Sequence, residues 1–175
     1  MLKLNDDKTE FLVVSSKSLG VEDAELTLNI GDCRVHSTDK ARNLGVIFDN
    51  KLNMENHISQ VCRAAYHHIR DLYKIRQNLT TEATISAVQA LVTNKLDFSN
   101  AILYGLSSSE IKRLQKVQNC AARLICCTKR REHISPKLME LHWLKVKYRI
   151  QYKIYMLTYK CLKGMAPQYL IEMLQ

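Results

Sequence analysis

The sequence predicts an α+β fold, in which a small antiparallel sheet precedes a helical bundle and helix predominates overall. The 175 residues include only two prolines and five glycines, which favours long regular elements over a turn-rich all-β fold. Apolar residues alternate or form short runs in the first part of the chain, and then recur at spacings of three and four. The hydrophobic fraction of 46% is enough for a buried core. We therefore expect a β region over residues 1–53 and a helical region over 54–175.

Four short segments in the first region predict strands. They are either apolar runs or alternate with period two, and a Gly-Asp turn signal separates the second from the third. The segments are 11–14, 26–30, 33–36 and 44–48. The polar stretch between the first two predicts a loop over residues 15–25.

The first three helices are predicted from apolar spacing and capping residues. The first begins near residue 54, where the apolar period changes from two to three and four. Thr80 or Thr81 can cap the second helix. Ser107 and Glu110 have the spacing of a capping box, so we expect the third helix to open there.

Three further helical segments are expected towards the end of the chain. Ser135 followed by Pro136 predicts a short helix, with serine as the N-cap and proline at the first helical position. A long helix is predicted over Val146–Leu162, and Gly164 ends it. Pro167 then leads into a short turn or helix.

The basic charge is concentrated in the helical region. Residues 1–53 hold seven of the 26 Lys/Arg and nine of the 17 Asp/Glu, a net charge of −2. The other 19 basic and eight acidic residues give residues 54–175 a net charge of +11. A domain-sized positive field indicates a polyanionic partner, nucleic acid before an anionic membrane, although a merely solvated basic surface is the alternative.

The cysteines and histidines do not predict a metal site. Cys120, Cys126, Cys127 and His133 lie within a short span, but the cysteines mostly share one predicted helix without zinc-knuckle spacing. The sequence has no CxxC pair, secretory leader or transmembrane run. We therefore expect reduced thiols, no membrane role, and an intracellular location in the nucleus or cytoplasm. No catalytic triad or phosphate-binding glycine-rich loop is present, so no small-molecule substrate is expected.

The predicted helix over 146–162 carries two stripes of side chains. At about 100° per residue, an aliphatic stripe lies roughly opposite a stripe of four tyrosines, with basic residues on the flank between them. Cations beside aromatic rings suit a nucleic-acid backbone, because they neutralise phosphates while tyrosines stack or form hydrogen bonds. The alternative is a helix packed on both sides, with only the hydroxyls at the surface. Together with a basic loop, which could equally be a solvated segment, the predicted nucleic-acid-binding residues are Lys129, Arg130, Arg131, Lys145, Arg149, Tyr152, Lys153 and Lys160.

Several short motifs resemble the reverse transcriptases of LINE-type (non-LTR, jockey-like) retrotransposons. Asn5-x-x-Lys8-Thr9-Glu10, and Leu44-Gly45-Val46 with Asp49, are similar to the last palm motifs of that family. Segments of the helical region are also similar to the family's post-palm part. These are Leu103-Tyr104-Gly105, Val117-Gln118-Asn119, His133-Ile134-Ser135-Pro136, Leu141-His142-Trp143-Leu144 and Gly164-x-Ala166-Pro167. Their order and spacing carry the resemblance, which departs from the family at Lys145, where a proline is expected.

The resemblance implies a fragment of an RNA-directed DNA polymerase, consisting of the end of the palm and the thumb. Mg²⁺ in the intact family enzyme is held by an aromatic-Ala-Asp-Asp motif that would precede Leu4, and these 175 residues do not include it. This chain is therefore expected to be inactive alone and to need no cofactor. The adjacent Asp6 and Asp7 do not replace the motif, because their polar neighbours are typical of a solvated turn.

One lysine and one group of four residues match functional positions of the family. Lys8 corresponds to a lysine near the incoming triphosphate, and its alternative role is a surface lysine before a strand. Four residues resemble the primer grip, where glycine allows close approach of the primer backbone, and their alternative is a simple strand bend. The primer-grip-like residues are Leu44, Gly45, Val46 and Asp49.

The sequence leaves more than one function open. The implied partner is an RNA/DNA template–primer duplex held through its phosphates, without sequence readout. The alternative is a non-enzymatic helical protein-interaction domain, or an inert product of a decayed element. In that case the basic flank is only surface and the tyrosine stripe is packed.

Overall fold

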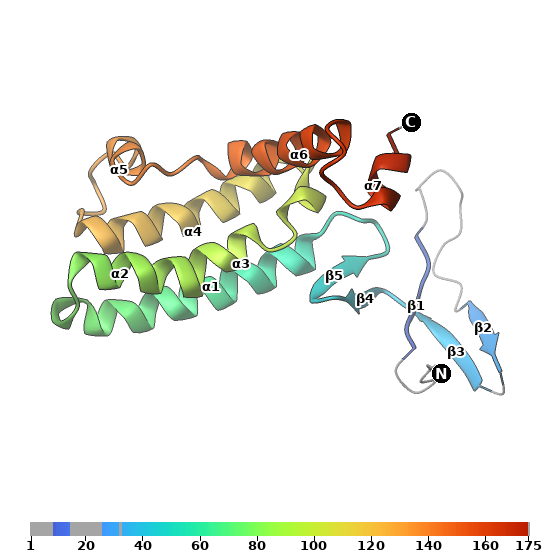
Figure 1. The fold of residues 1–175 in the computed structure, drawn as a ribbon. Helices are drawn as coiled ribbons and strands as arrows, with labels where there is room; N and C mark the ends of the chain where they lie inside the picture. Colours follow the sequence, from blue (N-terminus) through green and yellow to red (C-terminus); the bar gives the residue numbers. More distant parts are fainter. Residues whose placement is uncertain (1–8, 15–25, 32, 175) are drawn as a thin grey trace. The chain divides into compact units, whose positions relative to one another are not determined.

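The computed structural model describes residues 9–14, 26–31 and 33–174, and it confirms the predicted α+β class. Short strands come first and helices form most of the rest (Figure 1). The chain divides into two compact units, Met1–Ser59 and Gln60–Gln175. The first turn of the long helix α1 (Glu55–Ile75) thus belongs to the unit that holds the strands.

The first unit contains a three-stranded sheet and a separate hairpin among its described residues. β1 (Phe11–Leu12), β2 (Thr27–Ile30) and β3 (Cys33–Thr38) form the sheet in the order β1-β3-β2. β2 and β3 are antiparallel, with Thr27 opposite His36, whereas β1 runs parallel to β3. β4 (Lys40–Asn43) and β5 (Val46–Asp49) form the hairpin, in which Asn43 faces Val46.

Each of the four predicted strand segments overlaps an observed strand, although β3 and β5 extend past the predicted ends, while β4 was not predicted. Its sequence Lys-Ala-Arg-Asn has one apolar residue, so no alternation reveals it. Its extended conformation is stabilised instead by antiparallel pairing with β5. The loop predicted for 15–25 lies outside the described residues.

The helices follow the predicted order. Besides α1 they are α2 (Thr81–Val88), α3 (Asn94–Asp97), α4 (Ser108–Cys126), α5 (Ser135–Glu140), α6 (Val146–Leu162) and α7 (Gln168–Glu172). A π-helical segment, Gln89–Thr93, joins α2 to α3, and 3₁₀ turns occupy Arg76–Asn78 and Asn100–Leu103. The predicted bounds of the long helix over 146–162 are confirmed.

The capping predictions are confirmed for two helices and shifted for a third. The hydroxyl of Thr80 accepts a hydrogen bond from the Ala83 amide, and that of Ser107 accepts one from Glu110. In α5 the N-cap is Ile134, so Ser135 is already helical. The proline that follows still lies in the first turn, where its missing N–H costs no intrahelical hydrogen bond.

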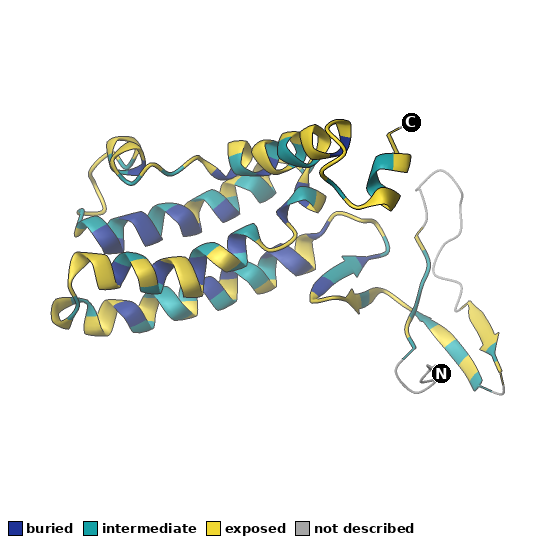
Figure 2. Cartoon of the chain, viewed as in Figure 1, coloured by how far each residue is buried: buried dark blue, intermediate teal, exposed yellow. Residues whose placement is uncertain are grey.

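The core of the second unit lies where its long helices meet. Figure 1 shows α1, the α2–α3 segment, α4 and α6 running alongside one another. Figure 2 shows buried residues along α4 and exposed residues over most of α6. The fully buried side chains of this unit include Val88, Val92, Leu114, Val117 and Ile125.

A single arginine joins the ends of α1 and α4. Arg76 donates hydrogen bonds to the carbonyls of Leu124 and Ile125, at 3.0 Å each, and to that of Leu79 at 2.9 Å. The last carbonyls of a helix have no intrahelical partner, so this guanidinium satisfies groups that would otherwise be left open. Helix α4 has Cys127 as its C-cap, and this residue adopts a left-handed φ of 50°.

Two glutamines of α4 hold the beginning of α6. Gln118 is 2% exposed, and its amide donates to the Leu144 carbonyl at 2.8 Å. The Gln115 side chain accepts from the Val146 amide at 2.9 Å and donates to the Gln118 side chain at 2.8 Å. These bonds fix where α6 starts, and so they position the candidate interface on that helix.

Candidate nucleic-acid interface

The tyrosine stripe of α6 lies at the surface. The four tyrosine residues are 51% to 66% exposed, while the opposite face of the helix is buried at Val146, Ile150 and Cys161. The exposed rings belong to Tyr148, Tyr152, Tyr155 and Tyr159. The interpretation in which these rings are packed within the chain therefore does not describe this structure.

Exposed lysines accompany the tyrosines on α6. Lys145 occupies the N-cap position, and Lys153 and Lys160 follow along the helix. None of the three has a carboxylate partner within the described residues. Their charges therefore remain available to a polyanion.

Arg149 is engaged differently from these lysines. Its guanidinium forms a two-pronged ion pair with Asp97 of α3, in which Nε donates to Oδ1 at 2.8 Å and Nη2 pairs with Oδ2. The Asn100 side chain donates to the same carboxylate at 3.3 Å. A forked arginine–carboxylate pair is geometrically specific. Arg149 therefore links α6 to α3 and contributes less to the outward potential than its lysine neighbours.

The basic loop between α4 and α5 has an ordered backbone. Arg123 of α4 donates to the carbonyls of Arg130 and Glu132, at 3.3 and 2.9 Å. The Glu132 carboxylate accepts from the Lys129 amide at 3.1 Å. Lys129, Arg130 and Arg131 are all exposed. Sequence reasoning found this cluster but missed Arg123, whose helical position gives no hint of its reach across the loop.

The primer-grip-like residues form the turn and far end of the β4–β5 hairpin. Leu44 and Gly45 connect the strands, with φ of 46° and 86°. Two positive φ values are typical of a type I′ hairpin turn, which glycine adopts readily and leucine does not. Leu44 is 88% exposed, so its conformation is held by the turn and not by packing. Val46 is buried.

Asp49 ends the hairpin and organises the segment that leads into α1. It is 5% exposed, and its carboxylate accepts hydrogen bonds from the amides of Lys51, Asn53 and Met54, at 3.1, 3.0 and 2.8 Å. Leu52 and Met54 of this segment have positive φ. The carboxylate therefore stabilises a turn that would otherwise be costly for residues with a β-carbon.

A buried histidine joins the same hairpin to the first turn of α1. The Nδ1 atom of His57 accepts a hydrogen bond from the Ile47 amide at 3.5 Å. Burial, and secondarily the positive charge of Arg42, lower the pKa of His57. The neutral imidazole is the form that can accept this bond.

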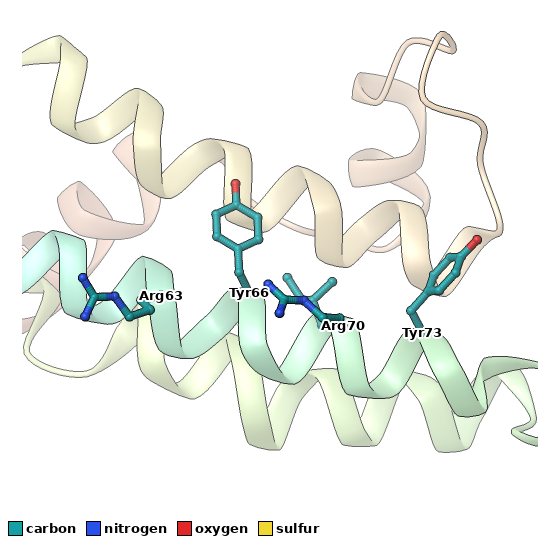
Figure 3. Close-up of a pocket in the computed structure, with 5 residues that line it drawn as sticks. Arg63, Tyr66, Arg70 and Tyr73 are labelled. Carbon is teal, nitrogen blue, oxygen red and sulfur yellow. The ribbon is translucent and has the colours of Figure 1, made fainter.

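A second set of basic and aromatic residues lies on α1, and the sequence analysis did not identify it. Arg63, Tyr66, Ile69, Arg70 and Tyr73 line an open groove of about 510 Å³. Figure 3 shows the arginines and tyrosines alternating along the helix. Their spacing of i, i+3, i+7 and i+10 places them on one face of the helix and could have predicted the set. The sequence analysis used only the apolar positions of this helix, which predict its buried face.

The remaining predictions concern residues or groups that form no site in this structure. Lys8, Asp6 and Asp7 lie outside the described residues. All six cysteines are free thiols. Where residues are described, no cluster of three or more His, Cys, Asp or Glu side chains is arranged to hold a metal ion. None of the described helices combines the length and apolar character needed to cross a bilayer.

Comparisons with known proteins identify no relative. No protein-family model, curated protein or solved structure matches this chain. The similarity to LINE-type reverse transcriptases accordingly rests on the short sequence motifs alone.

Proposed function

We propose that the helical region of this chain binds a nucleic-acid backbone, as the thumb-like part of a LINE-type reverse transcriptase, and does not polymerise alone. The observation that carries this proposal is the outward face of α6. Four exposed tyrosines lie there beside Lys145, Lys153 and Lys160, which have no carboxylate partner among the described residues.

The chemistry of this face suits phosphates more than base edges. Lysine ammonium groups neutralise phosphates and release condensed counterions, which makes binding favourable and dependent on salt. Contacts of this kind position a protein on a duplex but do not read its sequence. We therefore expect similar affinity for duplexes of unrelated sequence.

The reverse-transcriptase origin is supported by the palm-like motifs. The Leu44–Gly45 turn has the positive φ values at which glycine is favoured, and Asp49 shapes the chain that enters the first helix. These local roles give a physical reason for a Leu-Gly-Val segment followed by aspartate before a helix.

Charge reversal on α6 tests the binding proposal. Lys153→Glu should weaken binding of a labelled RNA/DNA hybrid in a fluorescence-anisotropy titration, and should lower the salt dependence of log Kobs by about one. The matched control is Lys51→Glu, which changes the net charge equally but lies at an exposed site in the first unit. Equal losses in both variants would show that only net charge matters, which would contradict a binding surface on α6.

A primer-extension assay tests the expected lack of catalysis. With a primed RNA template, Mg²⁺ and deoxynucleotides, residues 1–175 should give no product, since the sequence contains no Asp-Asp pair in an apolar context. Extension above the no-protein background would overturn this part of the proposal.

A helical protein-interaction domain is the second candidate, and the end of the chain favours it. Leu162, Met165, Tyr169 and Met173 are exposed apolar or aromatic side chains near α7. Tyr152→Ser separates the two functions, because it should weaken hybrid binding only if the α6 face holds nucleic acid. An unchanged Kd, combined with unchanged stability, would favour the protein-interaction function.

A further inference from the structure

The groove on α1 alternates cationic and aromatic side chains over a short length of helix. At about 1.5 Å per residue, the arginines are about 10 Å apart along the axis and the tyrosines are spaced equally. The groove therefore spans roughly 15 Å, or about four nucleotides at the stacked spacing of one strand. Ile69 adds an apolar side chain to its lining.

The arginines in the groove are available to a ligand. Arg63 and Arg70 are exposed, and neither pairs with a carboxylate in the part of the chain that the structure describes. The nearest acidic residue along the helix is Asp71, which is already paired with His67 at 2.7 Å and Lys74 at 2.9 Å. The groove therefore presents positive charge that no described partner neutralises.

The two tyrosines offer aromatic surface in different ways. Tyr73 is 74% exposed. Tyr66 is more enclosed and lies close to Cys62 of its own helix and to Cys120 of α4. Burial, together with the nearby Cys120 and Cys62, raises the pKa of Tyr66 to about 12, so the ring stays neutral and adds no negative charge to the groove. One ring is thus partly enclosed and the other is open to solvent.

We propose that this groove binds single-stranded nucleic acid, with phosphates on Arg63 and Arg70 and unstacked bases on Tyr66 and Tyr73. A single strand is the ligand whose anionic and aromatic groups alternate as these side chains do. A duplex hides its base faces within the stack, and a peptide made only of acidic residues has no aromatic plane to offer the tyrosines. The inference shares the ligand class of the proposed function but concerns a different helix and a different form of nucleic acid.

Anisotropy titrations with a labelled eight-nucleotide thymidine strand and a blunt duplex of the same length test this inference. Tyr73→Leu should weaken strand binding about tenfold, as expected for loss of one stacked base, whereas Tyr73→Phe should retain it. Arg70→Ala should also weaken strand binding, while the matched control Lys74→Ala, one turn further along the helix, should not. Thermal melts establish that each variant is folded.

The outcomes separate this inference from the proposed function. If the α1 variants weaken strand binding but leave duplex binding within twofold, while Lys153→Glu does the reverse, both proposals hold. If the strand binds through α1 but no duplex binds, only the proposed function fails. The inference is overturned if the α1 variants bind the strand like wild type, if they lose duplex binding equally, or if polyglutamate of equal charge competes as well as unlabelled strand.

Discussion

At the scale of single residues, polar side chains in this protein satisfy backbone groups that the fold leaves without partners. Asp49 serves three amides in a turn, and Arg76 serves three carbonyls at helix ends. A buried backbone group without a partner costs free energy comparable to a lost hydrogen bond. Each of these residues therefore matters more to local order than its exposure or charge suggests.

Replacing Asp49 should loosen the turn before α1. Asp49→Ala leaves the amides of Lys51, Asn53 and Met54 without acceptors, and should cost about 2–3 kcal/mol of local stability. Hydrogen exchange at these amides should accelerate accordingly. In Asp49→Asn, which keeps one acceptor oxygen, the exchange rates of these amides should lie between those of the wild type and of the alanine variant. Unchanged exchange in the alanine variant would show that the turn is held by other contacts.

The hairpin should weaken in acid through His57. Because the folded pKa lies below the unfolded value of about 6.5, the neutral form is favoured by folding. The stabilisation is present above the unfolded pKa and is lost as pH falls through it towards the lowered folded value. Protection of the Ile47 amide, corrected for intrinsic exchange, should fall over this range. His57→Gln should remove the dependence, and an NMR titration of Arg42→Ala should show a higher imidazole pKa.

At the scale of elements, the sequence predicts helix caps and helix ends, which depend on neighbouring residues. It does not predict features that depend on contacts between distant segments. The Thr80 and Ser107 caps and the bounds of α6 follow from local preferences and period. Strand β4 has no pattern of its own, and the π-helical segment Gln89–Thr93 continues a helix without a sequence signal. The candidate interface on α6 was likewise visible as a stripe, whereas the pairing of Arg149 depends on a residue 52 positions away.

The start of α6 should depend on Gln118. Gln118→Leu keeps the volume but leaves the Leu144 carbonyl and a Gln115 amide proton without their partner, so it should cost about 1–3 kcal/mol. Trp143 is the only tryptophan in the chain and lies next to this contact, so its fluorescence during urea unfolding reports the change. Lys112→Leu, at an exposed site on the same helix, should leave the midpoint nearly unchanged. Similar unfolding midpoints for both variants would contradict the role of Gln118 in holding the start of α6.

At the scale of the whole molecule, the charge is divided unequally between the two ends of the chain. The helical region carries all of the net positive charge, while residues 1–53 are slightly acidic. A polyanion should therefore be drawn to the helices, over a range that salt shortens. The folded structure refines this average, because Arg149 is paired with Asp97, whereas Lys145, Lys153 and Lys160 have no carboxylate partner among the residues that the structure describes.

Salt should accordingly weaken duplex binding by a predictable factor. If Lys145, Lys153 and Lys160 each contact one phosphate, raising the salt from 50 to 200 mM should lower affinity by about 40-fold, at about 0.9 per contact in the logarithmic slope. Anisotropy titrations across this range measure the slope. A slope near zero would mean that binding does not depend on these cations.

The length of helix α1 is constrained by its contacts. Arg76 lies at its end and reaches two particular carbonyls of α4, while Arg63 and Tyr73 keep to one face. One inserted residue would turn everything after it by about 100° and move it by about 1.5 Å. Insertions near the start would carry Arg76 away from α4, and insertions within the groove would also break its alternation. We therefore expect insertions and deletions to be tolerated in the connecting loops, while the number of residues in α1 stays constant.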